Sequence, residues 1–169
     1  AKKDESKNLG NLETKISNAF DIARLWLSEV TQFSTSEQPK LLRRSVWVQD
    51  AMPLFAEFSE PVASSMAKAL SENIVEAMPE ELANLLGPAS KFIGNAGAAI
   101  FAMQLGQAMG KLSTQTLSAT EIGIPISSRP GLITQNVGEF IKDIETPKSE
   151  IVIYLAIREL AISSLYASN

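Results

Sequence analysis

Two pairs of carboxylates stand at a spacing that could support chemistry. Glu72 and Glu76 are four residues apart, as are Glu139 and Asp143, so each pair would lie on one face of a helix. Paired carboxylates can hold a hard divalent cation or divide the roles of acid and base. A lysine stands close to each pair, which is typical of a solvated helix surface. We therefore interpret both pairs as solvated and assign them no catalytic role.

The chain has no histidine and no cysteine among its 169 residues. Without cysteine it has no disulfide, no thiolate ligand for zinc or iron–sulfur clusters, and no thiol nucleophile. Without histidine it has no Ser-His-Asp triad and no imidazole ligand. The glycine fingerprints of phosphate and dinucleotide sites are also missing, as is a calcium-binding loop. We therefore predict no metal and no cofactor.

Residues 158–162, Arg-Glu-Leu-Ala-Ile, stand on an expected helix in the register of a zinc-peptidase motif. In His-Glu-x-x-His, two histidines four residues apart hold zinc, and the glutamate polarises the attacking water. Here Glu159 takes the position of the glutamate, but Arg158 and Ile162 take the positions of the ligands. The spacing thus predicts no metal site and no catalytic residue.

Several short segments form an ordered series along the chain. They are DIARLWLSEV at 21–30, VWVQDAMP at 46–53, EPVA at 60–63, QLGQAMG at 104–110, ATEIGIP at 119–125, NV at 136–137 with Phe140, and YLAIRE at 154–159. In this order they resemble a bacterial zincin-like metallopeptidase family. Many of its members are described only as hydrolases or as proteins associated with deazaflavin-coenzyme biosynthesis. The resemblance covers about residues 21–167.

The resemblance implies a zincin-related helical domain that lacks the family's zinc site. The final motif of the family looks like Leu-Arg-Glu-x-x-His or His-Glu-x-x-His, and this chain keeps only Arg158 and Glu159 of it. Ile162 stands where the histidine would be, and a zincin needs a third ligand further along the chain. The resemblance therefore leaves Glu159 as a vestigial motif position, and Arg158 and Ile162 as vestigial ligand positions.

Arg158 is predicted to lie on an apolar stripe of the last helix. The stripe has spacings of four and three residues and comprises Ile151, Leu155, Arg158, Ile162 and Leu165. A guanidinium in such surroundings is costly unless it is paired and hydrogen-bonded. We expect it to reach an acidic side chain, with Glu121 as the main candidate, or the carbonyls at a helix end. The alternative is that it reaches solvent along its aliphatic stem.

The apolar pattern predicts a mainly α fold, a single-domain bundle of about six to seven helices. A long, charge-poor helix over about residues 88–118 is expected to be central and buried, and the last helix should span about 148–167. Pro53 should kink or split one helix, and both Pro61 and Pro79 should begin new ones. At most one short edge strand is expected, at residues 121–126.

A polar lead over residues 1–12 is expected to precede a zincin-like helical domain over residues 13–169. The net charge of −4 has the wrong sign for a protein that neutralises nucleic-acid phosphates. No apolar run reaches the roughly 20 residues that a membrane-spanning helix needs. We expect a cytoplasmic protein that pairs with a second copy or with another protein.

Two functions from different classes are compatible with these features. The favoured one is a zincin-like metallopeptidase-family protein that lacks zinc ligands and is non-catalytic, with a structural or binding role. The alternative is the N-terminal part of a longer metallohydrolase whose site is completed by residues absent here. Nothing in the sequence favours a metal-free enzyme that uses carboxylates or lysine.

Overall fold

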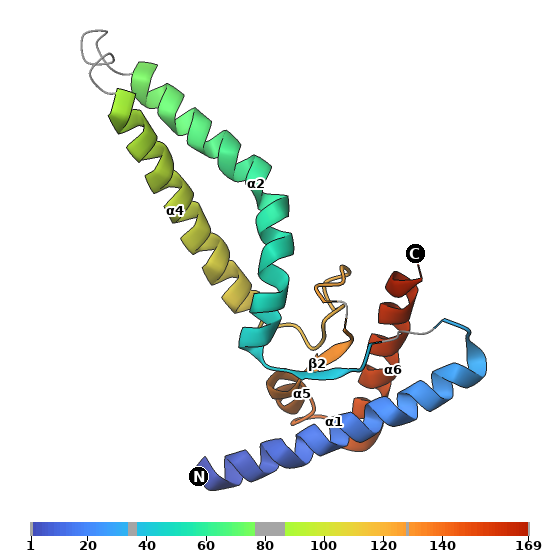
Figure 1. Cartoon of the computed structure of the whole chain (residues 1–169). Coiled ribbons are helices and arrows are strands. Elements are labelled where there is room, and N and C mark those ends of the chain that lie inside the picture. Colours follow the sequence, from blue (N-terminus) through green and yellow to red (C-terminus); the bar gives the residue numbers. More distant parts are fainter. Residues whose placement is uncertain (1, 34–36, 77–86, 128, 169) are drawn as a thin grey trace. The chain divides into compact units, whose positions relative to one another are not determined.

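The computed structural model describes residues 2–33, 37–76, 87–127 and 129–168, and these residues are mainly helical (Figure 1). The elements in chain order are α1 (Lys2–Val30), β1 (Lys40–Leu42), α2 (Arg44–Glu76), α4 (Gly87–Leu112), β2 (Gly131–Ile133), α5 (Thr134–Phe140) and α6 (Lys148–Ala167). The predicted mainly α fold is confirmed. The described residues form five helices, slightly fewer than predicted. The short helix expected at Pro79 lies outside the described residues.

The chain divides into two compact units. The first unit combines Ala1–Ala51 with Leu112–Asn169, and the second unit is the intervening Met52–Lys111. Helix α2 begins in the first unit and continues into the second.

The core of the first unit lies where α1 crosses α6 and contacts α5 (Figure 1). Helix α1 contributes one apolar face at spacings of three and four residues, which is typical of an amphipathic helix. The buried side chains that form this core are Ile16, Ala19, Phe20, Ala23, Leu132, Val137, Ile141, Val152, Leu155, Ala156 and Leu160. Helix α1 begins at Lys2, so the polar lead is helical where the structure describes it.

Strands β1 and β2 form a small parallel sheet in which Lys40 pairs with Gly131. On its other side, β2 meets Ser118 through an isolated antiparallel bridge to Leu132. The position of Gly131 has no room for a side chain, because an added Cβ would lie 2.8 Å from Cδ1 of Leu42. The strand predicted at residues 121–126 is not formed. Those residues turn instead, with Gly123 at φ 77°, a conformation that favours glycine.

The second unit contains the rest of α2 together with most of α4. Helix α2 runs through Pro53 and Pro61 without ending, so the prediction of a new helix at Pro61 is wrong. Each proline removes one amide donor, but the helix stays continuous on both sides of it.

The predicted long, charge-poor helix is present as α4, but the expectation that it is buried is wrong. Ile100 and Met103 are 54% and 58% exposed, and most of its other described side chains are exposed as well. Small residues occur on every side of α4, so its sequence presents no apolar stripe that would fix one inner face. Among the described helices, none combines the length and hydropathy of a bilayer-spanning segment.

Candidate functional site

The candidate motif at residues 158–162 lies on helix α6, whose bounds agree with the prediction from sequence. The face of α6 that is buried differs from the predicted one. The buried side chains of α6 are Val152, Leu155, Ala156, Glu159, Leu160 and Ser164. This stripe contains Glu159 instead of Arg158. The predicted stripe was therefore rotated by one position, because residues 151–157 are apolar almost all round and leave the inner face ambiguous.

Glu159 is buried, at 1% exposure, and both of its carboxylate oxygens accept hydrogen bonds. Oε2 accepts from the Thr120 hydroxyl at 2.6 Å and from the Thr120 backbone N–H at 3.4 Å. Oε1 accepts from the backbone N–H of Gly131 at 2.9 Å. The carboxylate thus joins α6 to the loop before β2 and to β2 itself. A buried carboxylate is stable only with such partners.

Arg158 forms a two-point ion pair with Glu121, which confirms the predicted partner. Nη2 of Arg158 donates to Oε1 of Glu121 at 2.9 Å, and Nη1 donates to Oε2 at 3.3 Å. The two side chains are 34% and 24% exposed. The hydrogen bond with Glu121 raises the pKa of Arg158, partial burial opposes it, and the charge of Glu121 adds to the increase.

These contacts form a clasp, which we define as Thr120, Glu121, Gly131, Arg158 and Glu159. Two adjacent residues of the loop bind two adjacent residues of α6, one pair inside the core and one nearer solvent. Neighbouring positions on a helix point about 100° apart, which accounts for the inward and outward directions. The clasp joins two segments that the sequence separates by almost forty residues.

A second buried network, centred on Asn136 of α5, holds the beginning of the same loop. Its side-chain amide donates to the backbone carbonyl of Ser113 at 2.7 Å and to that of Thr116. Its oxygen accepts from Nε of Arg44 at 2.5 Å, and Arg44 also pairs with Glu139 at 2.6 Å. The loop between α4 and β2 is thus held from α2, α5 and α6 within the first unit.

The residues at the motif do not fit a zinc ion. The guanidinium of Arg158 is positively charged and has no lone pair for a metal, and Ile162 has no donor atom in its side chain. The oxygens of Glu159 already accept hydrogen bonds from Thr120 and Gly131. Within the described ranges, no three acidic side chains come together in a way that could hold a metal ion.

The paired carboxylates of the sequence lie at the surface where they are described. Glu72 is 61% exposed and lies 3.7 Å from Lys68, and Glu139 is 68% exposed beside Arg44. These contacts agree with their interpretation as solvated.

Three important residues were missed by reasoning from sequence, namely Thr120, Gly131 and Asn136. One signal was available. A glutamate in a long apolar helix needs donors if it faces inward, and Thr120 stands next to the predicted partner of Arg158. Asn136 stands in a segment that resembles the family, but nothing local gives a role to it or to Gly131, since their partners come from distant segments.

Comparison with known protein families gives a match over the whole chain. The model of a family described as zincin-like metallopeptidase matches residues 1–169. No curated protein and no solved structure matches the chain.

Proposed function

The chain belongs to the zincin-like metallopeptidase family, and from this premise we propose that it is a non-catalytic member with a structural or binding role. The observation that carries the proposal is the state of Glu159. In a zincin the corresponding glutamate must reach a metal-bound water. Here Glu159 is 1% exposed, and the donors on both of its oxygens belong to the protein.

The residues beside Glu159 support the same conclusion. Arg158 and Ile162 supply no zinc ligand, and Arg158 is already paired with Glu121. The glutamate of the motif therefore has a use that does not depend on a metal, which is to hold the loop before β2 against α6.

Exposed apolar side chains in the second unit support a binding role. Phe58, Val62 and Met66 are spaced by four residues on α2 and are 57%, 53% and 49% exposed. Ile100 and Met103 on α4 are exposed to a similar extent. Large exposed apolar patches on soluble proteins mark interaction sites. We propose that these side chains pair with a second copy of the chain, since closed homo-oligomers are the commonest assemblies.

The alternative is a longer metallohydrolase whose site is completed by residues absent here. It would require a different conformation of Glu159. To act on a metal-bound water, its carboxylate would have to leave Thr120 and Gly131. Both hydrogen bonds connect buried groups, so their loss would leave unpaired polar atoms.

Metal analysis with a stability measurement tests the proposal. The purified chain should contain far less than one zinc per molecule, and excess zinc should not raise its melting temperature, because a ligand stabilises a protein only by binding the native state. Glu159→Gln should lower the melting temperature in the complete absence of metal. Stoichiometric zinc, together with peptide hydrolysis that a chelator abolishes, would contradict the proposal.

A further inference from the structure

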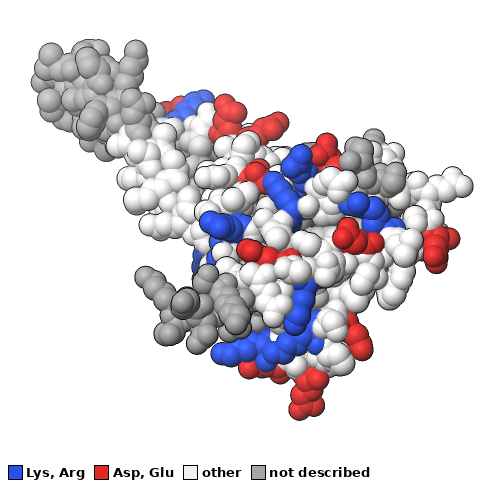
Figure 2. All heavy atoms as spheres, turned by 60° about the horizontal axis from the view of Figure 1, so that its bottom comes forward, with Lys and Arg blue, Asp and Glu red and all other residues white. Residues whose placement is uncertain are grey.

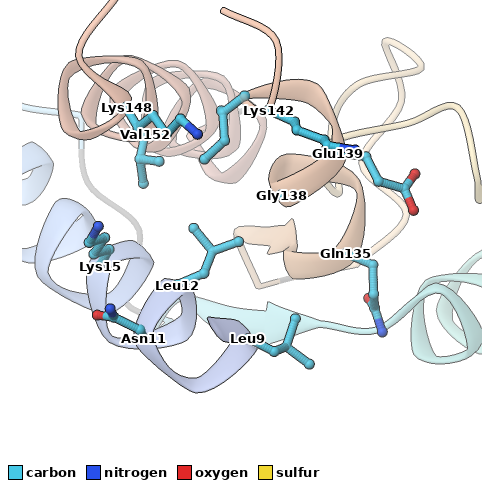
Figure 3. A pocket seen from close by; sticks show the side chains of 11 residues that line it. Leu9, Asn11, Leu12, Lys15, Gln135, Gly138, Glu139, Lys142, Lys148 and Val152 are labelled. Carbon is cyan, nitrogen blue, oxygen red and sulfur yellow. The ribbon is translucent and has the colours of Figure 1, made fainter. Parts of the chain in front are cut away.

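A cleft of about 590 Å³ lies between α1, α5 and α6 in the first unit, where α6 contributes Lys148 and Val152 from its first turns, ahead of the clasp residues Arg158 and Glu159 (Figure 3). This volume is within the range of roughly 300–1,000 Å³ that is typical of small-molecule sites. None of the clasp residues lines it. The cleft is therefore independent of the clasp and of the catalytic question.

The floor of the cleft is apolar. Leu9 and Leu12 come from α1, Ile141 follows α5, and Val152 comes from α6. Gly138 of α5 permits the close approach, because a Cβ at this position would lie 3.0 Å from Cδ2 of Leu12. An aliphatic group in the cleft would meet carbon atoms contributed by three elements.

Three lysines surround this floor, at Lys15, Lys142 and Lys148. In Figure 3 Lys15 and Lys148 lie at the same end of the cleft, on opposite walls. None of the three forms an ion pair with a residue that the structure describes. Among the described residues of the lining, Glu139 carries the one carboxylate, and it is paired with Arg44. The described lining residues therefore carry more positive than negative charge around an apolar floor.

This local charge is opposite to the net charge of the chain, which is −4. Figure 2 shows acidic and basic side chains interspersed over the visible face, with a group of basic ones in the lower part of the view. A cluster of lysines without acidic partners repels itself, and an anion relieves that repulsion.

We propose that the cleft binds a single-chain amphiphile with an anionic head, such as a fatty acid or an alkyl phosphate. The head lies between Lys15 and Lys148, and the aliphatic tail covers Leu9 and Leu12. Charge complementarity selects the head, and the apolar floor selects the tail. A carboxylate and a phosphate head share this chemistry, and the experiment separates them.

Calorimetric titration at monomeric ligand concentrations tests the proposal with five probes: dodecanoate, dodecyl phosphate, dodecylamine, acetate and inorganic phosphate. The two anionic amphiphiles should bind one to one, and the tighter of the two identifies the preferred head. Dodecylamine lacks the negative charge, and acetate and inorganic phosphate lack the tail, so these three should bind at least about tenfold more weakly.

Charge-reversal variants locate the site. Lys15→Glu and Lys148→Glu should each weaken dodecanoate binding by about tenfold or more, because they replace attraction with repulsion. Arg43→Glu is the matched control. It makes the same change in net charge at an exposed residue outside the cleft, and binding should stay within about twofold.

Methyl NMR of the unaltered protein keeps the test informative if a variant fails to fold. Dodecanoate should shift the methyl signals of Leu9, Leu12 and Val152. The proposal is overturned if dodecanoate does not bind, if dodecylamine binds equally well, or if Arg43→Glu weakens binding as much as the lysine variants. Binding only to vesicles that contain anionic lipid would also overturn it and would indicate a membrane surface instead.

Discussion

Thr120 donates two hydrogen bonds to one oxygen of Glu159, one from its hydroxyl at 2.6 Å and one from its backbone N–H at 3.4 Å. The other oxygen of Glu159 accepts from Gly131. A residue that the family motif places beside a metal is therefore, in this chain, a buried support for a loop.

Glu159→Gln should destabilise the protein without a change in metal content. A glutamine places an NH₂ group against donors, so one buried bond is lost, and the expected decrease in the free energy of unfolding is about 1–3 kcal/mol. Denaturant unfolding measures it. Glu145→Gln, at an exposed position, is the control and should change stability by less than about 0.5 kcal/mol. Equal stability of the two variants would show that the carboxylate of Glu159 is not a support.

The pair of Arg158 and Glu121 should contribute a small coupling energy. A double-mutant cycle with Arg158→Met and Glu121→Gln should give about 0.2–1 kcal/mol, because both side chains are partly exposed and solvent screens them. High salt should reduce this value. A coupling energy of zero at low salt would contradict the ion pair.

The pH dependence of Arg158 follows from the direction of its shift. The pKa of Arg158 is raised in the folded chain, chiefly by its hydrogen bond with Glu121. Its stabilising contribution is therefore fully present below the unfolded-state pKa and is lost only as the pH rises through the higher folded-state value. Arg158→Met should thus lower stability by a constant amount between about pH 7 and pH 10, where arginine is charged in both states. A difference that changes steadily over this interval would contradict the assignment.

Gly131→Ala should destabilise the first unit by about 1–3 kcal/mol, because the new methyl group would overlap the side chain of Leu42. Gly106→Ala is the matched control. An added Cβ at Gly106 meets nothing within 4 Å, and alanine favours a helix, so this variant should be neutral or stabilised by up to about 1 kcal/mol. Thermal unfolding of both variants measures the difference. Similar melting temperatures would contradict the close packing at Gly131.

The exposed apolar side chains of the second unit should make the chain self-associate. Light scattering after size exclusion at micromolar concentration should report a mass above 18.3 kDa, the mass of one chain. Ile100→Glu and Met103→Glu together should return it to the monomer, because buried charges oppose pairing. Ser17→Glu together with Asn18→Glu, at exposed positions of α1 in the first unit, adds the same charge and should leave the mass unchanged. A monomeric unaltered chain would rule out the proposed pairing.

Parts of the fold were predictable because their signals are local. The bounds of α6 follow from Pro147 before it and a sustained apolar sequence within it. Ile16, Phe20 and Ala23 follow from the helical spacing of α1. The partner of Arg158 was predicted correctly, but from a premise that the structure overturns, since Arg158 is not on the buried face of α6 and its side chain is 34% exposed.

Other parts depend on contacts between distant segments. Three-residue strands carry almost no periodic signal, so the pairing of Lys40 with Gly131 has no counterpart in the local sequence. The inner face of α6 was misplaced because its apolar residues surround the helix, and only the donors on Thr120 and Gly131 decide that Glu159 points inward. The exposure of α4 depends on which other elements pack against it, and the sequence of α4 alone does not predict those elements.

The division of the first unit into Ala1–Ala51 and Leu112–Asn169 has a consequence for synthesis. Lys40 leaves the ribosome well before its strand partner Gly131, by roughly 5–20 s at ordinary rates of translation. During this interval the apolar face of α1 has no α6 to cover it, whereas Met52–Lys111 is already complete. The apolar face of α1 is therefore uncovered during this interval, and a chaperone that acts on the nascent chain at this stage should bind α1.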